Sequence, residues 1–293
     1  MTEHWHDTGN GPVFARHWGQ ESAPVLLMLH GFPEYGGAWD ALARELADSF
    51  YCIAPDQRGY GQTGGPDDVA AYTTSSLTRD MVDLITGLDR GPVLVLGHDW
   101  GAAVAYGLSM WHGALVDRLI IANGVHPVPF QRALAAGGAQ SAASTYMTWL
   151  RAEGSQDALS RDGFAKLQDL FAAHMDMSWL AGDTLEAYRR EWARPGRLKT
   201  MLHWYRASPL IVAEPGKPRT DLPEFPLERL QVPHPHLLIW GENDTAVLLE
   251  ATEGLEAFAP RLTRVILPGA DHWLAHQKPR EMAAIMKDWV RNT

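Results

Sequence analysis

Residues 97–101 read Gly-His-Asp-Trp-Gly (GHDWG) and follow directly on the apolar run PVLVL. A Gly-x-nucleophile-x-Gly frame in this position is typical of a sharp strand-to-helix turn that presents a nucleophilic side chain at the end of a buried sheet. Serine usually occupies the centre of this frame, whereas this chain has Asp99. The stretch therefore predicts a strand before the turn, a helix after it and a carboxylate in the nucleophile's position. The simpler alternative is an aspartate that caps the helix.

Other short apolar runs predict further strands of the same sheet. They lie at residues 25–29, 51–54, 93–96, 119–122, 236–240 and 264–268, and a turn signal follows each of them. Such continuous runs suit strands that are buried on both faces of a parallel sheet. Helical patterns separate the runs, for example at 75–91, where apolar residues recur at three- and four-residue steps. The alternation of strands and helices predicts an α/β fold with a mostly parallel sheet.

The strand pattern stops between about residues 126 and 213, where the sequence is helical and rich in Ala, Trp and Met. Residues 214–235 then contain six prolines, which exclude a regular helix or a central strand. We therefore predict a first part of the core over residues 1–125, a helical cap with a proline-rich return over 126–225, and a second part of the core over 226–293.

The composition narrows the class of protein. The chain has 293 residues, of which 46% are hydrophobic, so it can bury a large core. Its net charge of −10 argues against nucleic-acid binding, since phosphate contacts need a basic face. The single cysteine, Cys52, stands in an apolar context that predicts a buried thiol. Neither a secretion signal nor an apolar run of the ~20 residues that span a bilayer is seen, so we expect a cytoplasmic protein with no membrane partner.

Loops after three of the predicted strands carry the other candidate groups. The sequence HGFPE follows the first strand, and a loop in this place supplies a backbone N–H, here that of Phe32, to a developing oxyanion. The second such N–H would belong to Trp100. Asp244 and His272 each follow a later strand, so the chain order is nucleophile, acid, histidine. Glu242 is the main alternative to Asp244 as the acid.

Together these pieces resemble the α/β-hydrolase superfamily and, within it, the epoxide hydrolases that use an aspartate nucleophile. The matching stretches, spread over almost the whole chain, are HGFPE (30–34), DQRGYGQT (56–63), GHDWG (97–101), NGVHP (123–127), WGENDTAV (240–247) and GADHW (269–273). The resemblance implies a mostly parallel central sheet flanked by helices, with a helical cap inserted after the sixth strand. It implies no cofactor and no metal ion.

An aspartate nucleophile suits substitution at carbon. A free Asp side chain has a pKa of ~3.9, so Asp99 is ionised at neutral pH and can attack an sp³ carbon without a base, which gives an alkyl-enzyme ester. His272, oriented by Asp244, would then activate water against that ester. The N–H groups of Phe32 and Trp100 would stabilise the resulting oxyanion. Such an enzyme needs a leaving group, which can be a halide or a strained epoxide oxygen.

The residues typical of the dehalogenases related to this family match this sequence less well. Haloalkane dehalogenases commonly hold the halide with the Trp after the nucleophile plus an Asn or a second Trp. Trp100 fits, but Phe32 stands where the Asn often lies, and its side chain donates no hydrogen bond. Haloacetate dehalogenases usually have Arg where this chain has Trp100 and Ala103, and their acid lies where this chain has Asn123.

The opening of an epoxide needs a proton donor, and epoxide hydrolases use two cap tyrosines. Tyr205 in HWYRAS and Tyr146 in STYMTWLRAEG resemble the segments that carry them. A tyrosine hydroxyl has a pKa of ~10 and stays protonated at neutral pH. Simple packing in the cap is the alternative for either residue. The sequence thus favours conversion of epoxides to vicinal diols. A haloalkane dehalogenase is the alternative enzyme, and a catalytically idle small-molecule-binding protein fits this set less well.

The candidate pocket residues are Trp100, Phe32, Trp149 and His126. Trp149 could form a wall of an apolar pocket, and His126 stands at the entrance to the cap, where a structural role is the alternative. The expected ligands are a small apolar epoxide and water, and no nucleic acid. The sequence leaves a monomer and a homodimer both open.

Overall fold

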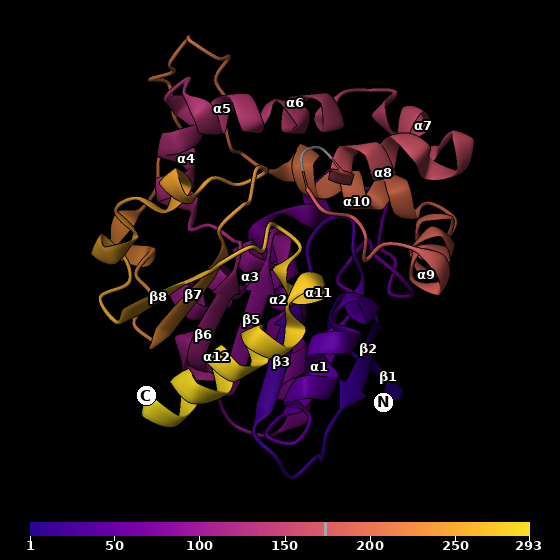
Figure 1. The fold of residues 1–293 in the computed structure, drawn as a ribbon, viewed down its shortest axis with the longest axis vertical. Helices are drawn as coiled ribbons and strands as arrows, with labels where there is room; N and C mark the ends of the chain where they lie inside the picture. The colour runs from indigo at the N-terminus through magenta and orange to yellow at the C-terminus, as the bar shows by residue number, and fades with distance from the viewer. Residues whose placement is uncertain (173–174) are drawn as a thin grey trace.

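Within residues 1–172 and 175–293, which the computed structural model describes, eight strands form one sheet in the order β1-β2-β4-β3-β5-β6-β7-β8 (Figure 1). The strands are β1 (Thr2–His6), β2 (Val13–Trp18), β3 (Val25–Leu29), β4 (Tyr51–Pro55), β5 (Val93–His98), β6 (Val116–Ala122), β7 (His236–Gly241) and β8 (Leu262–Leu267). β2 is antiparallel to β1 and to β4, and the other neighbours are parallel. The predicted α/β fold with a mostly parallel sheet is confirmed.

The N-terminal hairpin of β1 and β2 was not predicted from the sequence. β1 is an edge strand whose residues are mostly exposed, so it has no apolar run. β2 is buried throughout, but two of its buried residues are polar. Arg16 pairs with Asp56 at 2.7 Å, and His17 Nδ1 lies 2.6 Å from the Tyr51 hydroxyl. These polar side chains can be buried because each contacts a partner. The pattern of apolar residues therefore could not predict β2.

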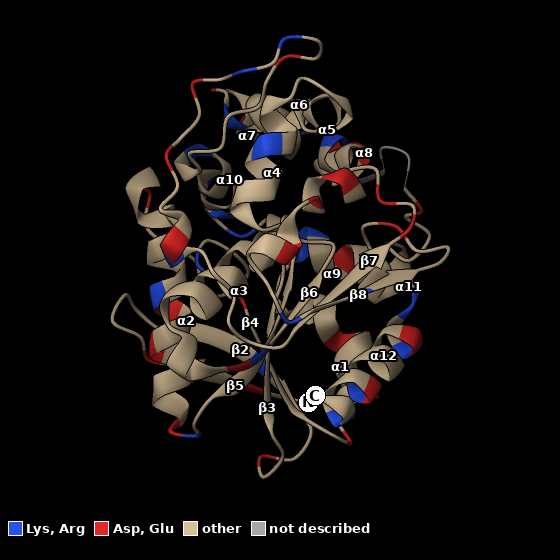
Figure 2. Ribbon diagram, turned by 90° about the vertical axis from the view of Figure 1, so that its left-hand side faces the viewer, with Lys and Arg blue, Asp and Glu red and all other residues tan. Residues whose placement is uncertain are grey.

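Helices cover both faces of the sheet. On one face lie α1 (Asp40–Leu46) and α12 (Pro279–Asn292), and on the other α2 (Thr74–Leu88) and α3 (Trp100–Trp111) (Figure 1). Side chains of β3 alternate between the two layers, since Leu26 and Met28 belong to one core cluster and Leu27 and Leu29 to the other. This double burial explains why the central strands are continuously apolar. Figure 2 shows the charged residues on outer elements such as α12.

A helical insertion follows β6 and lies over the carboxyl end of the parallel strands (Figure 1). Its helices are α4 (Pro127–Ala135), α5 (Ala139–Ala143), α6 (Thr145–Arg151), α7 (Ser155–Ser160), α8 (Ala165–Ala172), α9 (Gly182–Trp192) and α10 (Arg197–Ala207). The chain returns through residues 208–226 without helix or strand, as the prolines predict. The insertion after the sixth strand is confirmed, and the limits 126 and 225 stay a prediction.

Short helical segments complete the described chain. The 3₁₀ helices are η1 (Gly36–Trp39), η2 (Val69–Tyr72), η3 (Gly113–Leu115), η4 (Asp162–Phe164), η5 (Leu227–Arg229), η6 (Leu249–Thr252) and η7 (Leu255–Ala257), and a short α-helix, α11 (Leu274–Gln277), precedes α12. Among the helices of residues 1–172 and 175–293, none combines the length and the apolar character needed to cross a membrane.

Candidate active site

Asp99 occupies the turn between β5 and α3, in a backbone conformation that few residues other than glycine adopt. Its φ is 49°, which is uncommon for a residue with a side chain. Two glycines make room for the turn. A Cβ at Gly101 would collide with the carbonyl oxygen of Leu29, and a Cβ at Gly31 would collide with the Asp99 side chain. The start of α3 can therefore pack tightly against the loop after β3.

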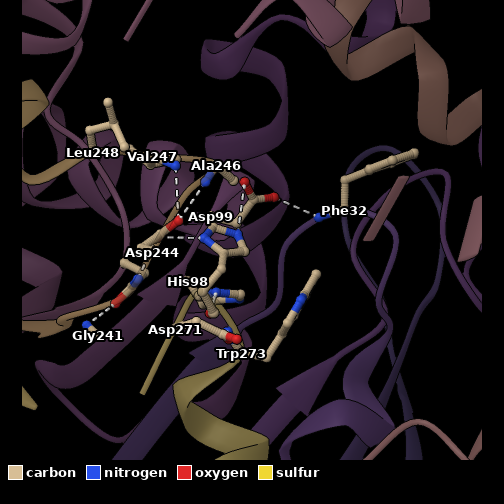
Figure 3. A network of polar contacts seen from close by, with 12 residues as sticks. Phe32, His98, Asp99, Gly241, Asp244, Ala246, Val247, Leu248, Asp271 and Trp273 are labelled. Carbon is tan, nitrogen blue, oxygen red and sulfur yellow. Dashed lines mark hydrogen bonds and ion pairs between the residues drawn. The ribbon is translucent and has the colours of Figure 1, made fainter. Parts of the chain in front are cut away.

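That loop donates a hydrogen bond to Asp99. The backbone N–H of Phe32 lies 2.7 Å from Asp99 Oδ1 (Figure 3). A carboxylate oxygen thus already rests where a donor could stabilise a developing oxyanion. The cap supports the loop, because the indole Nε1–H of Trp192 donates to the carbonyl of Pro33 at 2.8 Å. The matching donation from the Trp100 N–H stays a prediction.

His272 lies between two carboxylates. Its Nδ1 is 2.8 Å from Asp244 Oδ2, and its Nε2 is 3.7 Å from Asp99 Oδ2. Burial alone would lower the pKa of His272. The charge and hydrogen bond of Asp244, together with the charges of Asp99 and Glu34, outweigh burial and raise that pKa to about 9. At neutral pH the imidazole of His272 is therefore protonated.

The Asp244 carboxylate is held by four donors. Its Oδ1 accepts hydrogen bonds from the N–H groups of Ala246 at 2.8 Å and Val247 at 2.9 Å (Figure 3). Its Oδ2 accepts from His272 and from the Asn123 side-chain amide. With both oxygens engaged, the carboxylate has one orientation, and that orientation fixes the imidazole of His272.

Asn123, directly after β6, is the contact that the sequence did not assign to this site. It is fully buried, with a φ of 38°. Its Oδ1 accepts a hydrogen bond from the Gly241 N–H at 2.6 Å, so its NH₂ group must face Asp244. The only sequence signal was its place at a strand end, where haloacetate dehalogenases usually have their acid.

A second buried network joins the cap to this site. Glu34 Oε2 lies 3.2 Å from His98 Nδ1, and Glu34 Oε1 accepts from the Tyr188 hydroxyl at 3.0 Å and lies 2.7 Å from His276 Nε2. Burial raises the pKa of Glu34, but the hydrogen bonds with His276 and His98 outweigh it and hold that pKa well below its ordinary value.

His98, the residue before Asp99, completes this network. Its other nitrogen, Nε2, lies 2.8 Å from the backbone carbonyl oxygen of His272. His98 thus links the Glu34 carboxylate, in the loop after β3, to the loop that carries His272.

A cavity of about 750 Å³ opens at Asp99, and Trp100, Tyr146 and Tyr205 line it as well. The volume lies in the range of small-molecule sites. The ring of Tyr205 stands edge-on between those of Phe32 (5.1 Å between centroids) and Trp100 (5.0 Å). Burial, and then neighbouring groups including Asp99, raise the pKa of both tyrosines, so both hydroxyls stay protonated.

Three of the four candidate pocket residues do not line this cavity. Phe32 contacts the site through its N–H and through its ring, which packs against the ring of Tyr205. His126 begins α4, where its Nδ1 accepts from the Val128 N–H at 3.3 Å and its Nε2 donates to the Leu230 carbonyl at 2.9 Å. Trp149 packs under the Lys166 ammonium, 4.4 Å from its ring centre. These contacts are consistent with the structural role that was the alternative for His126, and a role in the pocket stays a prediction.

Comparison with known proteins gives consistent matches over nearly the whole chain. The sequence pattern of the family described as "Alpha/beta hydrolase family" matches residues 26–285. Epoxide hydrolase 3 of Mus musculus is 33% identical over 276 residues, which are 92% of this chain and 71% of the mouse protein.

Solved structures agree with this result. A structure described among "novel epoxide hydrolases" from metagenomes of hot environments has a TM-score of 0.89 and 32% identity, covering 99% of this chain and 98% of its own. The epoxide hydrolase of Bacillus megaterium, solved in complex with an inhibitor, has a TM-score of 0.88 and 29% identity, covering 98% of this chain and 100% of its own.

Proposed function

This chain belongs to the epoxide hydrolase family of the α/β-hydrolases, and we propose that it converts epoxides to vicinal diols through a covalent ester on Asp99. One observation carries the proposal: the Asp99 carboxylate and the hydroxyl-bearing rings of Tyr146 and Tyr205 line the same cavity. A nucleophile for carbon and two proton donors for the leaving oxygen thus face one space.

The first step is the opening of the epoxide. An Asp99 oxygen attacks an epoxide carbon, a new C–O bond forms, and the ring C–O bond breaks towards the epoxide oxygen. Tyr146 or Tyr205 gives its proton to that oxygen, and the second hydroxyl stabilises the phenolate that is left. Their raised pKa values support this role, because the donors remain protonated until the alkoxide forms.

The second step is hydrolysis of the ester. Esterification removes the negative charge of Asp99, one of the groups that raise the pKa of His272, so that pKa falls and the imidazole loses its proton. The released proton is the one that the phenolate needs. Neutral His272 can then take a proton from water, and the hydroxide attacks the ester carbonyl. The N–H groups of Phe32 and Trp100 stabilise the oxyanion. As it collapses, the bond between the carbonyl carbon and the diol oxygen breaks, and that oxygen takes the proton of the new Asp99 carboxyl group, so the diol leaves and Asp99 is again a carboxylate.

The test is a substrate panel with the purified protein. Styrene oxide and an aliphatic epoxide should give diols, while bromobutane and fluoroacetate should release no halide. Halide release without diol formation would make the protein a haloalkane dehalogenase, and no turnover of any substrate would favour a binding protein. In heavy-oxygen water, the diol from a single turnover should receive its new oxygen from Asp99. Label that enters the diol directly from water in that turnover would exclude the ester.

A further inference from the structure

Arg151, the last residue of α6, contacts the backbone of Tyr205, which lies in the last turn of α10. The Arg151 Nε donates a hydrogen bond to the Tyr205 carbonyl oxygen at 2.9 Å. The same oxygen accepts a bond from the N–H of Ser208 at 3.3 Å, where α10 ends. The last carbonyls of a helix lack partners within the helix and carry a partial negative charge. Arg151 thus supplies a donor and a positive charge to the end of α10.

Helix α6 contacts Tyr205 at a second point. Tyr146 lies in the first turn of α6 and Arg151 at its end. The rings of Tyr146 and Tyr205 have their centroids 6.3 Å apart, with an angle of 75° between their planes. One helix therefore carries the second tyrosine and the group that holds the Tyr205 backbone. The hydrogen bond from Arg151 helps to fix the spacing of the two tyrosines.

The position of the Arg151 guanidinium is unfavourable for the free energy of folding. The side chain is half-buried, and its Nη2 is buried without a hydrogen-bond partner among residues 1–172 and 175–293. No Asp or Glu of this part of the chain forms an ion pair with it. Burial lowers the pKa of the guanidinium, so the surroundings oppose its charge. Stability alone therefore gives no reason for a cation with an unused donor at this position.

A negative charge on Tyr205 would change this balance. In the proposed reaction, Tyr205 or Tyr146 gives its proton to the epoxide oxygen and becomes a phenolate. The charge of a Tyr205 phenolate would act against burial and raise the pKa of Arg151. By the same interaction, the charge of Arg151 would stabilise that phenolate. The arginine thus favours the state that forms when the epoxide opens.

We propose that Arg151 is a positioning residue for epoxide opening, which holds Tyr205 in place to give its proton to the epoxide oxygen. The inference rests on the proposed epoxide hydrolysis. Arg151 is not one of the described residues that line the cavity, so it acts through Tyr205 and not on the substrate. Ester formation uses the tyrosines, whereas ester hydrolysis uses His272. Loss of Arg151 should therefore slow the first step and leave the second unchanged.

The experiment measures the two steps separately, with styrene oxide and an excess of protein. Rapid quenching and mass spectrometry follow the ester and the diol in one turnover, and the two time courses together give the rate of each step. Arg151→Met removes the charge and the donors but keeps a flexible chain. It should slow ester formation about 10- to 100-fold, as expected for a displaced reacting group, and leave ester hydrolysis at the wild-type rate. Arg151→Lys keeps a charge and a donor and should fall between the two proteins.

These rates distinguish positioning from stability. A loss of folded protein lowers the amount of ester that forms, but it changes neither rate in the molecules that remain folded. A purely structural role of Arg151 would therefore leave both rates at their wild-type values.

Arg197, the first residue of α10, offers a matched control. Its Nε also donates to a backbone carbonyl, that of Gly61, at 2.6 Å, and burial lowers its pKa as well. Arg197 differs from Arg151 in its place, because it lies at the end of α10 that is remote from Tyr205. Arg197→Met should leave the ratio of the two rates unchanged.

The outcomes separate this inference from the proposed function. Ester formation at the wild-type rate in Arg151→Met, or an equal slowing of both steps, would overturn the positioning role. The same holds if Arg197→Met slows ester formation as much as Arg151→Met. In each case an ester on Asp99 of the wild-type protein would still support epoxide hydrolysis. If the wild-type protein forms neither ester nor diol, the proposed function fails and the inference fails with it.

Discussion

His272 Nε2 lies 3.7 Å from Asp99 Oδ2, so the charge of the proposed nucleophile acts directly on the proposed base. While Asp99 is ionised, it helps to keep the imidazole protonated, with a pKa of about 9. Once Asp99 is esterified, that contribution disappears. In the proposed reaction, the formation of the ester would thereby prepare the base that hydrolyses it.

The first prediction concerns this coupling. Asp99→Asn replaces the charged carboxylate by a neutral amide of the same size, so the pKa of His272 should fall below its wild-type value of about 9. NMR titration of the His272 ring measures it. Asp244→Asn should lower the pKa further, because Asp244 contributes both a charge and a hydrogen bond. An unchanged titration in Asp99→Asn would break the proposed link between the steps.

The second prediction concerns the proton donors. Tyr146→Phe/Tyr205→Phe should slow formation of the alkyl-enzyme ester by about 10²- to 10⁴-fold, the usual contribution of general acid catalysis. Mass spectrometry of the protein after a single turnover follows the ester directly. Tyr51→Phe makes the same chemical change at a residue that contacts His17 and lies outside the cavity lining, so it should form ester at the wild-type rate. Wild-type ester formation in the double variant would remove both tyrosines as donors.

The third prediction concerns Asn123. Asn123→Asp keeps the size of the side chain but places a second carboxylate against Asp244, and the added negative charge should raise the pKa of His272 in the ester intermediate. The neutral base then exists only at higher pH, so the pH profile of ester hydrolysis should shift to the alkaline side. A loss of rate without any shift would mean that Asn123 contributes only to stability.

Asn123→Ala separates stability from positioning. It removes both side-chain hydrogen bonds and keeps the strained φ, so we expect a loss of about 1–3 kcal/mol in the free energy of unfolding, measured in urea. Asn123→Gly removes the same bonds but tolerates the positive φ, and should be the more stable of the two.

The fourth prediction concerns acid stability. Burial lowers the pKa of His126 from 6.5 to about 4 in the folded protein. Between these pH values the unfolded chain binds a proton that the folded protein does not, so the free energy of unfolding decreases as the pH falls from 6.5 to 4. Urea unfolding at pH 7 and pH 4.5 measures this change. His126→Asn keeps a residue that can begin α4 and should show a smaller decrease. An equal decrease in both proteins would assign the acid sensitivity to other groups.

The sequence predicted the parts of the fold that follow apolar periodicity. The six apolar runs correspond to β3–β8. Of these, β3, β4, β5 and β7 are buried throughout, whereas β8, at the edge of the sheet, is only partly buried. The hairpin of β1 and β2 was missed, since β1 is exposed and β2 buries Arg16 and His17 through their partners. A polar side chain can be buried when it contacts a partner from a distant segment. The pattern of apolar residues along one segment carries no information about such a partner.

Some residues of the site could likewise be predicted from the sequence, and others could not. Asp99, Asp244 and His272 follow strand ends, and the parallel sheet brings such ends together, so their proximity was predictable from topology. Asn123 also follows a strand end, but its role depends on which way its amide faces, and the Gly241 N–H decides that. His126 stood in a matching motif, yet its partners are a helix start and the Leu230 carbonyl. A sequence motif shows where a residue lies in the fold. Only its hydrogen-bond partners show which of two neighbours in the same loop contacts the site.

Helix α9 contacts the loop after β3 twice, through Trp192 on the Pro33 carbonyl and through Tyr188 on Glu34. This has a consequence for recombining such proteins. The insertion is not an exchangeable module on an independent core, because α9 buttresses the very loop whose N–H faces Asp99. A chimaera that receives the cap of another protein should keep its fold, but the loop after β3 should no longer be held in place. The loop should keep its position only if the foreign cap contains residues equivalent to Trp192 and Tyr188.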